Sequence, residues 1–119
     1  MPRHLESRLQ IACKRWFDLQ YPKIARLCFS VPNGGFRSAV EAQFLKAEGS
    51  TAGVSDMIML IGSAAGKYSS LCIEFKAGTG KQTELQRTWQ QLAEQHGNKY
   101  VVCRSFDEFR NEIETYLKY

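Results

Sequence analysis

The hydrophobic residues of this chain occur with two different spacings, and the spacing predicts which segments form helices and which form strands. Apolar side chains recur at helical spacing over residues 5–20, which predicts a helix that ends before Pro22. Three further helical segments begin at capping sequences that start with Ser38, Thr83 and Ser105. The expected buried positions are Leu5, Leu9, Ala12, Trp16 and Leu19 in the first helix, Leu85, Trp89 and Leu92 in the third, and Phe106, Phe109, Ile113, Tyr116 and Leu117 in the last.

Short apolar runs without helical spacing lie between these segments, at residues 26–31, 57–61, 71–76 and 99–104. Such runs are typical of strands that are buried on both faces of a sheet. The predicted order is helix, strand, helix, strand, strand, helix, strand, helix. We therefore expect one α/β domain over residues 1–119, with a mixed central β-sheet that is flanked by helices.

The two middle strands are joined by a Gly/Ser/Ala-rich segment, residues 62–69, which predicts an antiparallel hairpin. Opposed residues in this hairpin would have numbers that sum to about 130 or 131, so Asp56 would lie opposite or next to Glu74. Lys76 would share the face of Glu74. Buried charges cost several kcal/mol unless they are paired or bind a cation. Two carboxylates and one ammonium group at a strand end therefore predict a divalent-cation site beside a nucleophilic water.

An aspartate followed on the next strand by Glu-x-Lys resembles the signature of the PD-(D/E)xK nuclease superfamily. The surrounding sequence resembles the stand-alone, single-domain members of the VRR-NUC family within it. One departure is Ser55, which stands where the family usually has a proline; it leaves the ligands in place. The resemblance extends from about Glu6 to Ser105 and is carried by Glu6, the Pro-Asn-Gly-Gly sequence at 32–35 with Arg37, the segment 45–49, the Gly-Val-Ser-Asp sequence at 53–56, the Glu-Phe-Lys sequence at 74–76, and Gln86 and Trp89.

The resemblance implies a restriction-endonuclease-like core and a Mg²⁺ ion, for which Mn²⁺ would be able to substitute. The implied ligands are Asp56, Glu74 and the backbone carbonyl oxygen of Phe75. Mg²⁺ prefers six oxygen ligands and retains several waters, so one or two carboxylates and a phosphate oxygen are enough to hold it. Such an ion lowers the pKa of a bound water and polarises the phosphate.

Three further residues have catalytic roles if the resemblance holds. Lys76 would orient the attacking water or stabilise charge on the phosphoryl oxygens. Glu6 would reach the metal directly or through water, and the amide of Gln86 would bind the attacking water or the phosphate.

Each of these residues also has a purely structural interpretation, which the sequence alone leaves open. Asp56 could be a capping residue, with Glu74 paired to Lys76 at a solvated sheet edge. Lys76 by itself could be a surface lysine whose stem covers apolar area. Glu6 could stabilise the first turn of its helix through the helix dipole, and Gln86 could only complete a capping box.

The Asn33, Gly34 and Gly35 sequence precedes a capping box and not a strand, which argues against a hairpin turn. Two glycines allow a backbone to approach a ligand closely, so we expect this loop to contact DNA phosphates, with Arg37 and Lys46 beside it. A loop without a ligand is the alternative.

The chain has 16 Lys and Arg residues against 12 Asp and Glu residues, a net charge of +4, which fits a polyanionic partner. Its four cysteines show no metal-binding spacing, which favours free thiols in a reducing compartment over zinc ligands or disulfides. The sequence shows neither a signal peptide nor an apolar run long enough to span a membrane, so we predict a cytoplasmic protein.

These observations lead to one preferred hypothesis, a Mg²⁺-dependent, structure-selective DNA endonuclease that resolves four-way (Holliday) junctions. Paired incisions require two active sites, so a two-fold homodimer is expected. The alternatives are a catalytically idle DNA-binding module with a nuclease fold, a sequence-specific restriction-type nuclease, and an RNA-cutting relative.

Overall fold

The structure is a computed structural model that describes residues 2–32 and 38–118. Its order of helices and strands is the one that the spacing of apolar residues predicts. The elements are α1 (Pro2–Gln20), a short 3₁₀ helix (Ala25–Leu27), β1 (Cys28–Ser30), α2 (Ala39–Ala47), β2 (Met57–Met59), β3 (Leu71–Phe75), α3 (Glu84–Gln95), β4 (Lys99–Cys103) and α4 (Phe106–Lys118). The first helix begins three residues earlier than expected, and β1 and β2 are shorter than expected.

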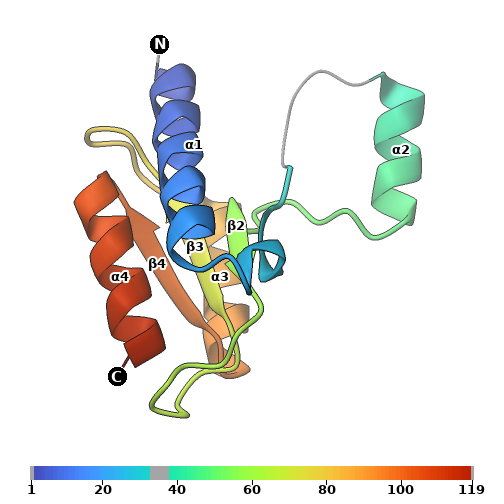
Figure 1. Ribbon diagram of the computed structural model, residues 1–119. Coiled ribbons are helices and arrows are strands. Elements are labelled where there is room, and N and C mark those ends of the chain that lie inside the picture. Colours follow the sequence, from blue (N-terminus) through green and yellow to red (C-terminus); the bar gives the residue numbers. More distant parts are fainter. Residues whose placement is uncertain (1, 33–37, 119) are drawn as a thin grey trace.

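The four strands form one mixed sheet in the order β1-β2-β3-β4 (Figure 1). The first two strand pairs are antiparallel and the last is parallel. Met57 is paired with Ile73, so the hairpin has the register in which opposed residue numbers sum to 130. The predicted α/β fold with a mixed sheet is confirmed, and its register brings the ends of β2 and β3 together.

Helices cover both faces of this sheet. The α1 and α4 helices pack on one face, where Phe17 and Phe109 are fully buried among the side chains of β3. The α3 helix covers the other face, where the ring centroids of Trp89 and of Tyr100 in β4 lie 6.1 Å apart. Glu74 lies on the face of α3, because side chains alternate along a strand and Ile73 and Phe75 face α1 and α4.

The predicted buried stripes of α1 and α3 are partly wrong. Leu5 and Leu19 are 55% and 81% exposed, and the fully buried side chains of α1 are those of Cys13 and Phe17. In α3, Leu85 and Leu92 are 60% and 53% exposed. The periodicity identified the helices correctly, but neighbouring stripes of a helix carry similar patterns, and contact with the sheet decides which one is buried.

The α2 helix projects from the rest of the molecule (Figure 1). Its side chains are exposed, except for that of Leu45, which is half-buried. Ser38 caps its first turn by accepting a hydrogen bond from the backbone N–H of Glu41 at 3.1 Å. The helix is therefore formed locally, without a core to pack on.

The four cysteines are free and buried, in agreement with the sequence-based prediction. Burial raises the pKa of Cys13, Cys28 and Cys103 to about 12, so these thiols stay protonated. Among the described residues, no helix combines the length and the hydropathy that crossing a membrane requires.

Candidate active site

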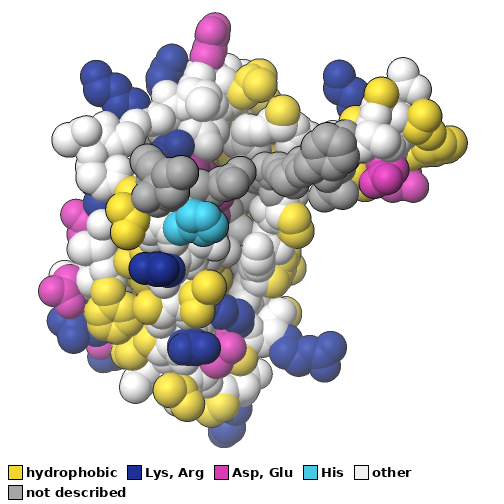
Figure 2. Space-filling model, turned by 90° about the horizontal axis from the view of Figure 1, so that it is seen from above, with side chains coloured by type: hydrophobic (Ala, Val, Ile, Leu, Met, Phe, Trp, Pro, Cys, Tyr) yellow, Lys and Arg dark blue, Asp and Glu magenta, His cyan; other side chains and the backbone are white. Residues whose placement is uncertain are grey.

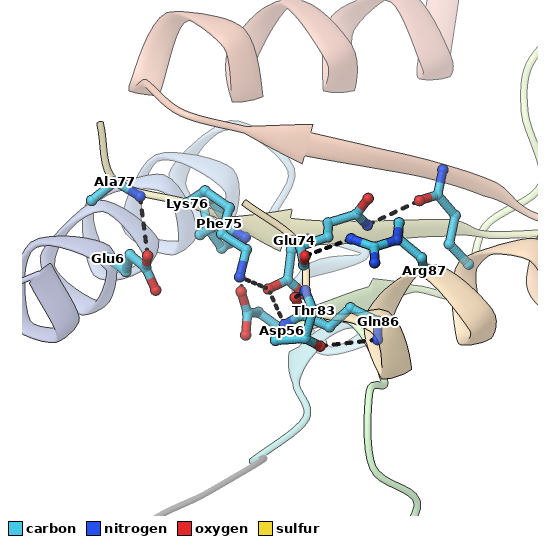
Figure 3. A network of polar contacts seen from close by, with 11 residues as sticks. Glu6, Asp56, Glu74, Phe75, Lys76, Ala77, Thr83, Gln86 and Arg87 are labelled. Atoms are coloured by element: carbon cyan, nitrogen blue, oxygen red, sulfur yellow. Dashed lines mark hydrogen bonds and ion pairs between the residues drawn. The ribbon is translucent and has the colours of Figure 1, made fainter. Parts of the chain in front are cut away.

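The two carboxylates predicted from the sequence meet at one end of the sheet (Figure 3). Asp56 directly precedes β2, and Glu74 is the fourth residue of β3. The Asp56 side chain accepts a hydrogen bond from the backbone N–H of Phe75 at 2.7 Å. Glu74 is only 2% exposed. The hairpin therefore places a buried glutamate beside an aspartate that the neighbouring strand holds in position.

Lys76 follows β3 and is also buried, with 9% of its surface exposed. Its Nζ atom lies 3.6 Å from Oε2 of Glu74. The interpretation of Lys76 as a surface lysine is therefore wrong. The structure thus places a buried ammonium group beside a buried carboxylate.

Gln86 completes the expected capping box and also contacts the candidate site. Its Oε1 atom accepts a hydrogen bond from the backbone N–H of Thr83 at 2.8 Å, which completes the capping box of α3. Its Nε2 atom donates a hydrogen bond to Oε2 of Glu74 at 2.9 Å. The cap thus fixes the amide so that its donor group points at the buried carboxylate (Figure 3).

Glu6 reaches the site from α1, and it does so without being in the first turn of that helix. Its Oε2 atom accepts a hydrogen bond from the backbone N–H of Ala77 at 3.1 Å. A Cβ atom at Gly80 would lie 3.9 Å from the same oxygen. Glu6 therefore holds the chain directly after Lys76, and the interpretation based on the helix dipole does not describe it.

Gly53 and Ser55, which precede Asp56, have structural roles that the sequence did not reveal. Gly53 has a φ of +87° and packs so tightly that an added Cβ would lie 2.5 Å from the backbone oxygen of Leu85. Ser55 is fully buried, and its hydroxyl donates to the backbone oxygen of Met57 at 3.0 Å. The segment before Asp56 is thus anchored against the first turn of α3, which carries Gln86. In the sequence, the glycine three residues before Asp56 was the signal that could have indicated this close approach of two backbone segments.

The predicted DNA-binding residues do not all lie at this site. Asn33, Gly34, Gly35 and Arg37 lie outside the described residues. Lys46 is exposed in the last turn of α2, on the projecting helix and apart from the carboxylates. The structure therefore brings together Glu6, Asp56, Glu74, Lys76 and Gln86, with Phe75 between two of them.

The charges of the site shift its acidic groups toward the protonated form. Burial raises the pKa of Glu74 to about 7, and the negative charge of Asp56 adds to the effect, whereas Lys76 opposes it. Burial also raises the pKa of Asp56, against the lowering effect of its hydrogen bond from Phe75. The two carboxylates repel each other and compete for one ammonium group, so a bound cation would stabilise both in their charged form.

The pKa of Glu74 leads to a prediction about stability. Because the folded-state pKa is above the unfolded value of 4.5, ionisation of Glu74 destabilises the metal-free protein as the pH rises through about 7. Glu74→Gln resembles the protonated form, so it should leave the melting temperature unchanged near pH 5. Near pH 8.5 it should raise the free energy of unfolding by about 2–3 kcal/mol, or the melting temperature by roughly 5–10 °C.

Thermal unfolding in excess chelator measures this difference, and Mg²⁺ added at the higher pH should then stabilise the wild-type protein but not the variant. If the melting temperatures of the two proteins differed by the same amount at both pH values, the loss of stability at high pH could not be assigned to ionisation of Glu74.

The donors at the site fit a hard divalent cation. Oε1 of Glu74 is buried and has no hydrogen-bond partner among the described residues. With Asp56 and the backbone carbonyl of Phe75 it offers oxygen ligands only, as Mg²⁺ prefers. Within residues 2–32 and 38–118, no group of three or more His, Cys, Asp or Glu side chains is close enough to bind a metal.

A mixed sheet with an aspartate and a Glu-x-Lys at the ends of neighbouring strands is the architecture of restriction-endonuclease-like nucleases. The chain belongs to the VRR-NUC family, because the family model described as "VRR-NUC domain" matches residues 5–107. A solved structure described as "VRR_NUC domain protein" is similar to it, with 26% identity, a TM-score of 0.80, and coverage of 95% of this chain and 88% of the other. A search of curated proteins found no significant match. The family and the fold that the sequence indicated are confirmed, and the family is one of nucleases.

Proposed function

We propose that this protein is a Mg²⁺-dependent, structure-selective DNA endonuclease that hydrolyses phosphodiester bonds, and that it cuts four-way junctions by paired incisions. The observation that supports the proposal best is the convergence of Asp56, Glu74 and Lys76. One buried oxygen of Glu74 has no hydrogen-bond partner among the residues that the structure describes. In a protein that only binds DNA, two carboxylates at the binding site would lower the affinity for DNA, because they repel phosphate.

In this proposal Asp56, Glu74 and the carbonyl oxygen of Phe75 hold the cation. When bound, Mg²⁺ would supply a water of lowered pKa and polarise the scissile phosphate, and Mn²⁺ could replace it. Lys76 stabilises the negative charge that develops on the phosphoryl oxygens, from a buried position where electrostatic interactions are strong. Product ends with a 5′-phosphate are expected from the superfamily.

Gln86 and Glu6 act as positioning residues. The Gln86 amide keeps Glu74 oriented while its other end is fixed in the helix cap. The Glu6 carboxylate fixes the backbone after Lys76 and can reach a bound cation through water. Both side chains come from helices, so α1 and α3 fix the site from opposite sides of the sheet (Figure 3).

The substrate class follows from size and charge. A small domain with a net charge of +4 has little surface with which to read bases, so DNA shape and backbone charge are better targets than a sequence. A two-fold homodimer would present two active sites to the diverging arms of a branch point. The basic segment between residues 33 and 37 and Lys46 would contact the phosphates.

A cleavage panel tests the proposal, with linear duplex, single-stranded, flap and four-way-junction DNA of matched sequence and an RNA duplex. We expect Mg²⁺ or Mn²⁺ to support cutting of the junction in preference to the linear duplex, at paired sites near the crossover. Calcium should support binding without turnover, and binding should weaken steeply with salt because counterions are released. Excess chelator is the control and should stop all cleavage.

Each alternative predicts a different result in the same panel. Binding without cleavage in every metal would indicate a catalytically idle module. Cutting of linear duplex at one sequence would indicate a restriction-type nuclease, and preferred cutting of RNA would indicate an RNA-cutting relative. Cleavage that survives excess chelator would rule out the metal mechanism.

A further inference from the structure

The connection between β3 and α3 begins directly after Lys76, and residues 77–82 of it are called the glycine turn below. Their sequence is Ala-Gly-Thr-Gly-Lys-Gln, with one basic residue and no acidic residue. The two glycines are separated by a single residue, whereas a nucleotide-binding P-loop has four residues between its glycines. The turn is therefore not a nucleotide site, but it is basic and lies beside the first half of α1, close to the candidate active site (Figure 1).

The glycine turn folds back over the candidate active site. Gly80 closes it by donating its backbone N–H to the carbonyl oxygen of Ala77 at 3.0 Å. A Cβ atom added at Gly80 would lie 3.8 Å from Cδ of Lys76 and 3.9 Å from Oε2 of Glu6. Gly80 thus packs against two residues of the site, and Lys81, the next residue, is exposed beside it.

Side chains hold the glycine turn at both of its ends. Near its start, Nη1 of Arg104 donates a hydrogen bond to the backbone oxygen of Gly78 at 2.9 Å. At its end, Nη1 of Arg87 donates to the backbone oxygen of Gln82 at 2.8 Å (Figure 3). The Gln82 amide donates in turn to Oε1 of Gln90 at 2.9 Å. The middle of the turn is therefore preorganised, which lowers the entropy cost of binding a ligand there.

These contacts leave Lys81 without a partner within the described chain. Its side chain is exposed and forms neither a hydrogen bond nor an ion pair with residues 2–32 and 38–118. Over the same residues, Arg87 and Arg104 form no ion pair with an acidic side chain. The turn and its two supporting arginines thus carry uncompensated positive charge, and an ammonium group of this kind suits a phosphate oxygen.

A DNA strand that enters the site needs a contact beside the scissile phosphate. Each strand carries one phosphate per about 3.4 Å of helix axis, so the neighbours of a phosphate at Glu74 also lie close to the protein. Lys46 lies on the projecting helix α2, apart from the carboxylates. Figure 2 looks onto the end of the molecule that carries the glycine turn, where Lys and Arg side chains reach the surface. Among them, Lys81 directly follows a residue that packs on the site.

We infer that the glycine turn binds the phosphate adjacent to the scissile phosphate of a DNA strand, through the ammonium group of Lys81. The contact goes to the DNA backbone, so it is independent of base sequence. It holds the strand in register, so that the scissile phosphate lies at the carboxylates and Lys76. The inference rests on the proposed function and deepens it by naming a substrate-binding residue and the group that it binds.

Binding of linear duplex and four-way-junction DNA in Ca²⁺ tests the contact with three substitutions of Lys81. Lys81→Ala should weaken binding of both substrates roughly tenfold and lower the slope of log K against log salt by about 1, because one phosphate contact is lost. Lys81→Glu should weaken binding further, and Lys81→Arg should restore it. Lys118→Ala, at the exposed end of α4, is the matched control and should bind as the wild-type protein does. Circular dichroism verifies that each variant is folded.

Uncharged methylphosphonate groups identify which phosphate Lys81 contacts. The cut is first mapped in Mg²⁺, and substrates are then made with a single methylphosphonate at each position around it. At one of the two positions adjacent to the cut, the group should weaken binding by the wild-type protein but not by Lys81→Ala, because the two changes remove the same contact. Equal losses in both proteins at both adjacent positions would overturn the inference.

Failure of this inference and failure of the proposed function give different results. A wild-type protein that cuts DNA, and whose binding withstands Lys81→Ala and Lys81→Glu, would keep the nuclease assignment and show that Lys81 is only a solvated lysine. A protein that binds DNA without cutting it in any metal would overturn the nuclease assignment, and the Lys81 variants would still decide whether the turn binds phosphate. A protein that does not bind DNA would overturn both.

Discussion

Glu74→Gln and Asp56→Asn should each reduce the rate of DNA cleavage by roughly 1000-fold or more, because each removes a charged ligand of the proposed cation. Both substitutions keep the shape and the hydrogen-bonding capacity of the side chain, so the fold should persist. DNA binding should stay the same or become stronger, because a negative charge that repels phosphate is lost. Single-turnover cleavage in Mg²⁺ and a binding assay in Ca²⁺ measure the two effects separately.

Asp107→Asn is the matched control for these variants. The Asp107 side chain is 76% exposed on α4, where it forms a 3.7 Å ion pair with Arg110. Its replacement should change neither cleavage nor binding measurably. If Glu74→Gln or Asp56→Asn kept a rate close to that of the wild-type protein in Mg²⁺, the proposed ligand set would be wrong.

The position of the carboxylates could be predicted from the sequence because the hairpin has a simple geometry. Two apolar runs joined by a short flexible segment have few possible registers, and a slip of one residue would turn every side chain to the other face. The observed pairing of Met57 with Ile73 is one of the two registers that the sequence left open, the one whose residue numbers sum to 130. It follows that Asp56 and Glu74 lie at the same end of neighbouring strands.

The roles of Gln86 and Glu6 could not be decided from local sequence alone. A capping box explains Gln86 fully at the level of one helix, and only the packing of α3 on the sheet shows that the same amide reaches Glu74. Glu6 is 71 residues from Ala77 in the sequence, and the two meet only because α1 packs beside the end of β3. Such contacts depend on how whole helices are placed, which a local pattern does not contain.

The burial of helix faces was predicted less well, for a related reason. Helical spacing identifies a helix, but the apolar stripe of a helix can face the core, a second molecule or solvent. Leu19 is exposed although it continues the predicted stripe of α1. Phe44 and Leu92 are exposed although both have the spacing of core residues. The spacing of apolar residues therefore identifies a helix without identifying the surface on which that helix packs.

Lys76→Ala should lower the rate of cleavage by roughly 10²–10⁴-fold while the protein still binds Mg²⁺, because the lysine acts on developing phosphoryl charge and not as a metal ligand. The substitution also removes the positive charge of Lys76, which opposes the rise of the pKa of Glu74. The variant should therefore need a higher pH than the wild-type protein to bind the metal. Cleavage is best compared at several pH values up to about 8.5, because the pKa of Glu74 is expected to be higher in the variant.

Stabilisation by Mg²⁺ in thermal unfolding separates metal binding from catalysis in the Lys76→Ala variant. The variant should still be stabilised by Mg²⁺ near pH 8.5, and its rate should stay low when the metal is saturating. Lys118→Ala, at an exposed position in the last turn of α4, is the control and should cleave at the wild-type rate. A Lys76→Ala variant that cleaves at the wild-type rate would show that Lys76 only neutralises Glu74. A variant that fails to bind Mg²⁺ even at high pH would show that the lysine organises the ligands and does not act on the phosphate.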